Sequence, residues 1–206
     1  MRFPRKGREM ACTAAQLRIL GFLTKSVAVL GQQGGQIGQA LQGVLADGRL
    51  PVSDLQPAVV PACVLMPGLL LDPRDPLMQS LADCVDDLHW KSPGFGRIPD
   101  AVSRQMAVVE ILGPDGMFVH QRVRLGVLLQ GEHLLYPNHK HLAQEVYHVL
   151  SGRAGWSVDS VAFQPREVGD FIYHRSNQLH AMKTQTDPLL ALWAWWGDIR
   201  SVSYEI

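Results

Sequence analysis

The stretch that decides the fold is 136-YPNHKHLAQEVYHVLSG-152, in the second half of the chain. It places His139, His141, Glu145 and Tyr147 within nine positions, and a second stretch, 169-GDFIYHRSNQLH-180, ends in His180. Imidazole and carboxylate groups in this combination suit one divalent Zn, Fe, Mn, Co or Ni ion, and an incomplete protein shell leaves room for a substrate. The two stretches therefore predict a site for a single metal ion.

The residues around Glu145 are typical of a β-strand, which we expect between His141 and Leu150. Alternate side chains of a strand point to the same face, so Glu145 and Tyr147 share one face and Val146 points to the other. If Glu145 points inward as a metal ligand, Tyr147 lies beside it as a candidate acid or base. The alternative is a barrel tyrosine whose hydroxyl group is simply hydrogen-bonded.

Short strands follow one another through the second half of the chain. Gly and Asp turns at 113–116, 151–154 and 168–170 separate them, and we expect 151–154 to be a tight turn after which the chain returns as a strand. This pattern predicts a sandwich or barrel and argues against a parallel α/β sheet. The expected strands cover residues 108–112, 118–129, 141–150, 156–158, 171–173 and 189–196. The last strand holds three tryptophans that cannot share one face, and we expect Trp196 to pack against the helical half.

The first half of the chain is predicted to be helical. Helical spacing of apolar residues covers about 11–30 and 37–46, whereas the proline-rich segment 51–76 allows no long element. Asp75 before Pro76 is typical of an N-cap, and the helix that follows is expected to run through Leu88. We therefore predict a helical region, 1–92, that packs on a β-barrel formed by 93–206.

Composition excludes some classes of function. The chain has 206 residues with 19 basic and 19 acidic side chains, which argues against a dedicated nucleic-acid surface. Three separated cysteines without a CxxC pair fit a reducing compartment. The basic N-terminus, MRFPRKGREM, is followed by no good signal-peptide core, and no segment is expected to reach the length of a membrane span. We expect a solvated tail and a cytoplasmic protein, monomer or homodimer, without a membrane partner.

The two motifs resemble those of the cupins. HKHLAQEVYHVLSG is similar to the first cupin motif, HxHxxxExxxxxxG, and GDFIYHRSNQLH is similar to the second. Arg175 stands where the second motif usually has proline and Asn177 where it has glycine, which affects turns rather than ligands. The resemblance implies a mainly β fold, a double-stranded β-helix (jelly-roll) barrel, with a helical N-terminal part.

A narrower resemblance is to the cupin-type dimethylsulfoniopropionate (DMSP) lyases. It is carried by the strand 192-LWAWWGDI-199 together with Tyr136, His139, His141, Glu145, Tyr147 and His180. The resemblance implies a metal held by His141, Glu145, His180 and, in some states, Tyr147. It also implies Tyr147 as the favoured base and places His139, Tyr136 and Trp195 in the pocket. Whether His139 acts as a ligand or as a base stays open.

The residue types suit the chemistry that the resemblance implies. DMSP carries a carboxylate and a sulfonium group, and elimination removes a proton beside the carboxylate and expels dimethyl sulfide, leaving acrylate. An unperturbed tyrosine has a pKa of about 10, so Tyr147 as a base needs a nearby cation. The faces of Trp193, Trp195, Tyr136 or Tyr173 are candidates for binding the sulfonium, at about 0.5–2 kcal/mol per contact.

Two other functions are compatible with the same ligand set. One is another cupin enzyme, such as a dioxygenase or isomerase, that acts on a different small carboxylate; the other is a non-catalytic ligand-binding cupin. The remaining histidines are interpreted as surface or hydrogen-bonded residues: His89, His120, His133, His148 and His174.

Overall fold

The computed structural model describes residues 12–33, 35–48, 50–70 and 74–206. The predicted solvated tail, 1–11, lies outside the described residues.

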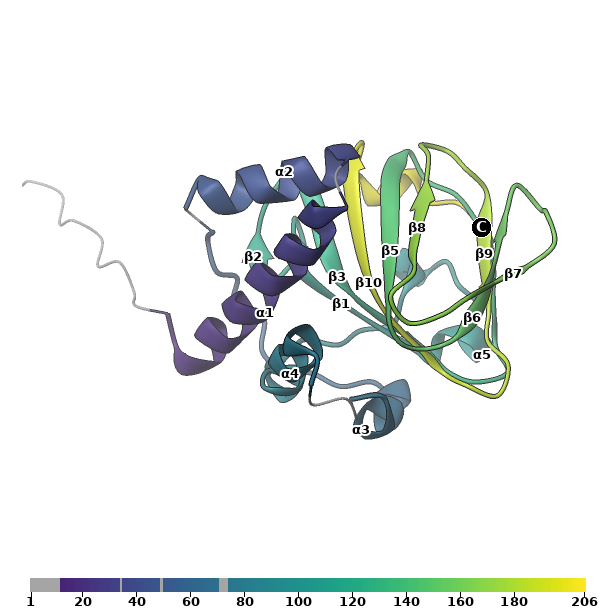
Figure 1. The fold of residues 1–206 in the computed structure, drawn as a ribbon, viewed down its shortest axis with the longest axis horizontal. Coiled ribbons are helices and arrows are strands. Elements are labelled where there is room, and N and C mark those ends of the chain that lie inside the picture. The colour runs from purple at the N-terminus through teal and green to yellow at the C-terminus, as the bar shows by residue number, and fades with distance from the viewer. Residues whose placement is uncertain (1–11, 34, 49, 71–73) are drawn as a thin grey trace, which may run out of the picture.

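Two β-sheets form a barrel in the described part of the chain (Figure 1). The larger sheet has the order β2-β1-β3-β10-β5-β8, and the smaller one has the order β4-β9-β6-β7. The larger sheet comprises β1 (Met106–Gly113), β2 (Phe118–Val119), β3 (Val123–Gln130), β5 (Ala143–Gly152), β8 (Phe171–His174) and β10 (Leu189–Gly197). The smaller sheet comprises β4 (Leu135–His139), β6 (Ala154–Val158), β7 (Gln164–Arg166) and β9 (His180–Lys183). The mainly β jelly-roll barrel expected from the sequence is confirmed.

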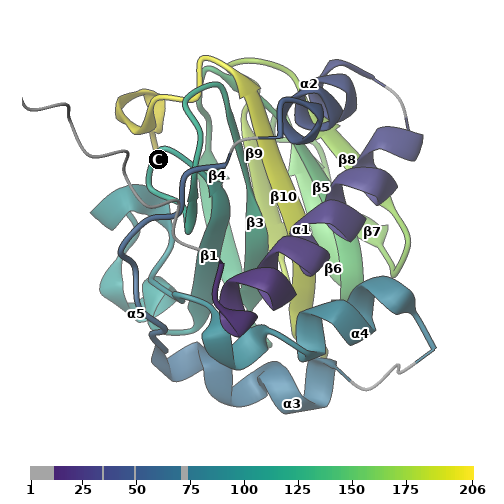
Figure 2. The ribbon, with the colours of Figure 1, turned by 90° about the vertical axis from the view of Figure 1, so that its left-hand side faces the viewer.

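Helices cover the outer face of the larger sheet, and Figure 2 shows α1 lying across its strands. Thr13 begins α1 with a capping box, in which its side chain accepts from the Gln16 backbone and the Gln16 side chain accepts in return. The helices are α1 (Ala14–Gln32), α2 (Gly35–Ala46), α3 (Met66–Leu69), α4 (Pro76–Ala82) and α5 (Asp100–Ser103), with short 3-10 turns at Pro61–Leu65, Val85–Asp87, Gly94–Gly96 and Ser201–Ser203. Because helices and sheet share one core, the division at residue 92 stays a prediction.

Strand alternation separates two hydrophobic cores. On β10, Leu192 and Ala194 pack with the helices, whereas Trp193 and Trp195 pack inside the barrel. The register pairs Trp195 with Glu145 and Trp193 with Tyr147 on β5, which also brings Glu145 and Tyr147 to the inner face. Trp196 packs against the helical core, as predicted.

The structure differs from the local predictions at the end of one helix, at one turn and in three additional strands. The helix after Asp75 ends at Ala82 instead of reaching Leu88, because acidic residues at its C-terminal end oppose the helix dipole. The strand expected at 156–158 is present as part of β6, but β5 continues to Gly152, where a tight turn was expected, and β6 pairs with β7 and β9 of the smaller sheet rather than with β5. Gly152 has φ +76, and a Cβ there would overlap the Pro188 carbonyl oxygen. The strands β4, β7 and β9 were not predicted, since Pro137, Pro165 and the short lengths hide their alternation.

The expectation about membrane-length segments also needs correction. Among the described residues, α1 is long and apolar enough to cross a membrane by length and composition, with 19 residues and a mean hydropathy of 1.2. Its buried face, which includes Phe22, Leu23 and Val27, packs against the protein core. The core helix of a soluble protein and a signal sequence near the N-terminus both pass the same test of length and composition.

Candidate metal centre

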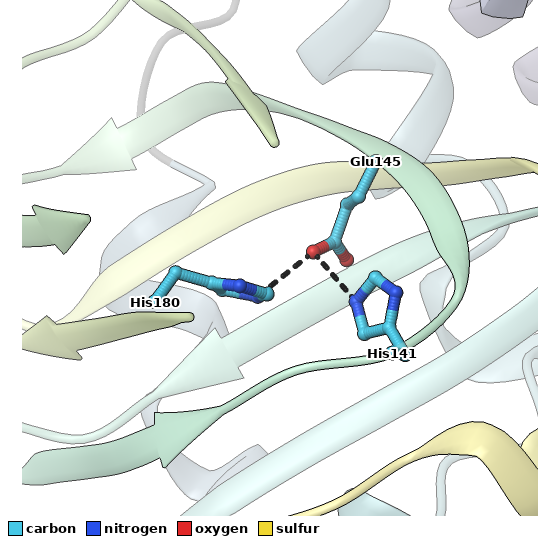
Figure 3. A group of neighbouring side chains, drawn as sticks. All are labelled: His141, Glu145 and His180. Carbon is cyan, nitrogen blue, oxygen red and sulfur yellow. Dashed lines mark hydrogen bonds and ion pairs between the residues drawn. The ribbon is translucent and has the colours of Figure 1, made fainter. Parts of the chain in front are cut away.

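Three ligand groups from separate segments converge inside the barrel. Glu145 comes from β5, His141 from the loop just before it, and His180 from the start of β9 in the other sheet, so that the imidazoles lie on either side of the carboxylate (Figure 3). Glu145 Oε2 lies 3.2 Å from His141 Nε2 and 3.1 Å from His180 Nε2. One ligand atom of each lies within 4.8 Å of the others, and all three residues are buried.

Backbone carbonyl groups orient the imidazoles. His141 Nδ1 donates to the Ala143 carbonyl at 3.0 Å, and His180 Nδ1 donates to the Gln178 carbonyl at 2.8 Å. A carbonyl oxygen only accepts, so Nδ1 carries a proton in both rings and Nε2 is the nitrogen that remains to bind a metal ion. The same arrangement orients ligating histidines in metal sites.

The donor set fits a divalent metal ion. Two Nε2 lone pairs and a carboxylate oxygen face one another, and acceptors this close require a shared cation or additional protons. His180 Nε2 is buried and forms no hydrogen bond with the described residues, although the carboxylate is near. Two histidines and one carboxylate leave coordination positions open for a small molecule.

Glu145 is held as a carboxylate. Burial alone would raise its pKa, but the positive charge and N–H donors that His141 and His180 present when protonated hold that pKa well below its usual range. Its second oxygen, Oε1, accepts a hydrogen bond of 2.7 Å from Trp195 Nε1. Trp195 also lies over His141, with ring centroids 4.0 Å apart.

His139 lies beside this group rather than within it. Its ring lies 4.1 Å from the His180 ring and 4.3 Å from the Tyr136 ring, between centroids. Nδ1 donates to the Pro137 carbonyl at 2.8 Å, and burial, with His180 nearby, lowers the pKa of His139 well below its usual range. His139 is therefore a neutral, oriented imidazole next to the three converging ligands.

Tyr147 is buried on the inner face beside Glu145, as the alternation predicted. Burial and then the Glu145 carboxylate raise its pKa well above the usual value. Without a cation nearby, Tyr147 is a phenol at neutral pH.

His174 was wrongly interpreted as a surface or hydrogen-bonded residue. It is buried, stacks on His180 with centroids 4.0 Å apart, and neither ring nitrogen finds a hydrogen-bond partner in the described part of the chain. Burial, with His180 beside it, lowers the pKa of His174 to about 3. It is a neutral ring behind one of the candidate ligands.

A cavity opens from this group toward the segment 91–95. Its lining combines Glu145, His139 and Tyr147 with aromatic and charged residues: Lys91, Phe95, Glu110, Tyr136, Trp193, Trp195 and Tyr204. Three of the four predicted substrate-binding residues, Tyr136, Trp193 and Trp195, line this cavity. Tyr173 does not, because it points outward from β8 between two inward residues and is 50% exposed.

Sequence reasoning missed Tyr204, Phe95 and an ion pair at the cavity wall. Glu110 Oε2 lies 2.6 Å from Arg124 Nη1, and both side chains are buried. Burial raises the pKa of Glu110 although Arg124 opposes the shift. These residues stand outside the metal motifs, and no spacing pattern marked them.

Known proteins are similar to this chain in sequence. A family model described as dimethylsulfoniopropionate (DMSP) lyase matches residues 41–191. The chain is 32% identical over 93 residues to the DMSP lyase DddQ of Ruegeria pomeroyi, covering 44% of this chain and 45% of that protein. It is 32% identical over 123 residues to the putative DMSP lyase DddL of Cereibacter sphaeroides, covering 59% of this chain and 51% of that one. The chain spans about half the length of these curated relatives.

Solved structures share the whole fold. One reported with the DMSP lyases RdDddP and RnDddQII matches with a TM-score of 0.72 and 26% identity, over 94% of this chain and 99% of that chain. DddQ from Ruegeria pomeroyi matches with a TM-score of 0.70 and 24% identity, over 89% and 93%, which shows a common fold. Because the family model covers most of the chain, this protein belongs to the DMSP lyase family.

Proposed function

We propose that this protein is a metal-dependent DMSP lyase that eliminates dimethyl sulfide from DMSP and leaves acrylate. Family membership supports the substrate. The observation that carries the proposal is the convergence of His141, Glu145 and His180 on one another, with Glu145 lining the same cavity as Tyr147.

His141, Glu145 and His180 would hold one divalent ion, and Trp195 would keep Glu145 in place through its hydrogen bond. When bound, the ion supplies positive charge next to the substrate carboxylate as the adjacent carbon loses its proton. All three residues are buried, which strengthens each electrostatic interaction among them.

Tyr147 is the proposed base. Its oxygen takes the proton from the carbon next to the carboxylate, the electron pair forms the new carbon–carbon double bond, and the carbon–sulfur bond breaks toward sulfur. Since burial and Glu145 keep its pKa high, Tyr147 ionises only with a cation close to its oxygen. Tyr147 is therefore also proposed as a ligand in some states, and His139 as a neutral partner that orients the substrate.

The test is dimethyl sulfide release from purified protein and DMSP, with Zn, Mn, Fe(II), Co and Ni each added to stripped protein. We expect metal-dependent release that is lost in His180→Ala and retained in His120→Ala, which lies outside the cavity. Tyr147→Phe should lose release while Tyr173→Phe keeps it. Full release of dimethyl sulfide by Tyr147→Phe would show that Tyr147 is not the base. Absence of release from protein with stoichiometric metal bound would show that DMSP is not the substrate.

Oxygen consumption separates elimination from the oxidative alternative. Elimination is redox-neutral, so DMSP with the Fe(II)-loaded protein should consume no oxygen. Uptake of oxygen with another small carboxylate would instead support a cupin dioxygenase, and tight binding without turnover would support a ligand-binding cupin.

A further inference from the structure

The C-terminal segment brings a tyrosine into the cavity. Tyr204 is 3% exposed, and its hydroxyl lies 2.8 Å from that of Tyr136. Its ring centroid lies 5.4 Å from that of His139 and 6.4 Å from that of His141. Tyr204 therefore forms a wall of the cavity next to the candidate metal centre.

Interactions on two sides fix this segment. Arg97 Nη1 donates to the Ser201 carbonyl at 2.7 Å and to the Tyr204 carbonyl at 3.0 Å. Lys140 and Glu205 form a β-bridge through their backbones and an ion pair of 3.1 Å. Tyr204 is thus held by backbone contacts on both sides, and its aromatic face has a defined position.

Phe95 completes the aromatic wall from the other side. Its ring centroid lies 5.8 Å from that of Tyr204 and 6.0 Å from that of Trp195. Its backbone is left-handed, with φ 52 and ψ 34, directly after Gly94 at φ +74. Left-handed backbone is rare for an aromatic residue and is concentrated at ligand-binding sites, so the chain maintains an unfavourable conformation that places this ring at the cavity.

The ring of Phe95 already interacts with a cation, since the Arg124 guanidinium carbon lies 5.5 Å from its centroid. Phe95, Trp195 and Tyr204 present aromatic rings without a nucleophile, and all three line the cavity. Aromatic faces attract a sulfonium or quaternary ammonium group without reacting with it.

We propose that Phe95 and Tyr204 are specificity residues that recognise an onium group and distinguish it from a neutral group of the same shape. This rests on the proposed function, in which the carboxylate of the substrate points to the metal centre and the onium group toward the segment 91–95. The ring of Tyr204 lies between the two groups that would face the ends of the substrate: its centroid is 5.4 Å from that of His139 and 5.8 Å from that of Phe95.

The test measures binding by calorimetry, with the purified protein in its metal-bound form, and does not need turnover. The probes are 3-(trimethylammonio)propionate, which is cationic at the far end, and 4,4-dimethylpentanoate, its neutral isostere. We expect the wild type to prefer the cationic probe. Phe95→Leu and Tyr204→Leu should each reduce that preference by about 2- to 30-fold, the equivalent of one cation–π contact.

Two control variants isolate the aromatic face. Tyr204→Phe keeps the ring and should keep the preference, and Tyr173→Leu removes an exposed tyrosine outside the cavity and should change nothing. Phe95 is 38% exposed, so Phe95→Leu folds and decides the question even where Tyr204→Leu does not. An unchanged preference in Phe95→Leu, or equal binding of both probes by the wild type, overturns the proposal.

The two proposals fail in distinguishable ways. If the wild type prefers the cationic probe but releases no dimethyl sulfide, the proposed lyase activity is wrong and the proposed recognition of an onium group stands. If the wild type releases dimethyl sulfide but the leucine variants prefer the cationic probe as strongly as the wild type does, only the proposed recognition of an onium group by Phe95 and Tyr204 is wrong.

Discussion

Replacing Trp195 by phenylalanine should weaken metal binding without disturbing the barrel. The indole Nε1 donates to Glu145 Oε1 at 2.7 Å in a buried setting, and phenylalanine keeps most of the apolar volume while removing the donor. A hydrogen bond to a charged group contributes about 1.5–3 kcal/mol. We expect the unfolding free energy of the metal-stripped protein to fall by about that amount. The metal dissociation constant should rise about 10- to 100-fold, the usual effect of removing an orienting partner.

Trp193→Phe is the matched control for this experiment. Trp193 lies on the same strand and the same face, is 6% exposed against 4% for Trp195, and its Nε1 has no hydrogen-bond partner within the described segments. Competition with a chelator measures the metal affinity of both variants, and urea denaturation measures the stability of both stripped proteins. If the two variants lose metal affinity equally, the hydrogen bond does not orient Glu145 and the reasoning is refuted.

Other predictions concern charge, stacking and metal. Arg124→Met leaves Glu110 buried without its partner and should cost about 3–5 kcal/mol in urea denaturation at neutral pH. Burial already raises the pKa of Glu110, and loss of Arg124 raises it further. A carboxyl group whose pKa is higher in the folded than in the unfolded protein stabilises the fold at pH values below its unfolded pKa, and this stabilisation is lost as the pH rises through the folded pKa. The cost of Arg124→Met should therefore shrink near pH 5, where more of Glu110 is protonated. A loss of unfolding free energy in Arg124→Met that does not change with pH would contradict this prediction. His174→Phe keeps the stack on His180 and removes two unpartnered ring nitrogens, so the melting temperature should stay equal or rise; a clear fall would show that His174 has a partner. Chelation should lower the melting temperature, with metal at a hundred times its dissociation constant adding about 2.7 kcal/mol, and the difference should vanish in His180→Ala.

Much of the inner face of the barrel could be predicted from sequence. Alternation along one strand placed Glu145 and Tyr147 together inside, and the same rule turned Trp196 toward the helices. Applied to β8, alternation would also have excluded Tyr173, since its neighbours Ile172 and His174 point inward. That error came from selecting an aromatic residue by type rather than by face.

Contacts between distant segments could not be predicted. Tyr136 and Tyr204 are 68 residues apart in the chain, and their contact depends on a C-terminal turn held by Arg97. Gly152 resembles an ordinary turn glycine, yet it marks the crossing between two sheets, which only the pairing of β6 with β9 reveals. Patterns along the chain carry information about neighbours in sequence, whereas these features are set by packing.

The way in which the histidines are oriented bears on how this family can diverge. His139, His141 and His180 each direct Nδ1 to a backbone carbonyl two positions away, at residues 137, 143 and 178. Every amino acid carries that carbonyl, so mutation at these three positions leaves the acceptor intact as long as the backbone path is kept. The imidazole geometry therefore depends on the strand and loop conformations rather than on the side chains at residues 137, 143 and 178.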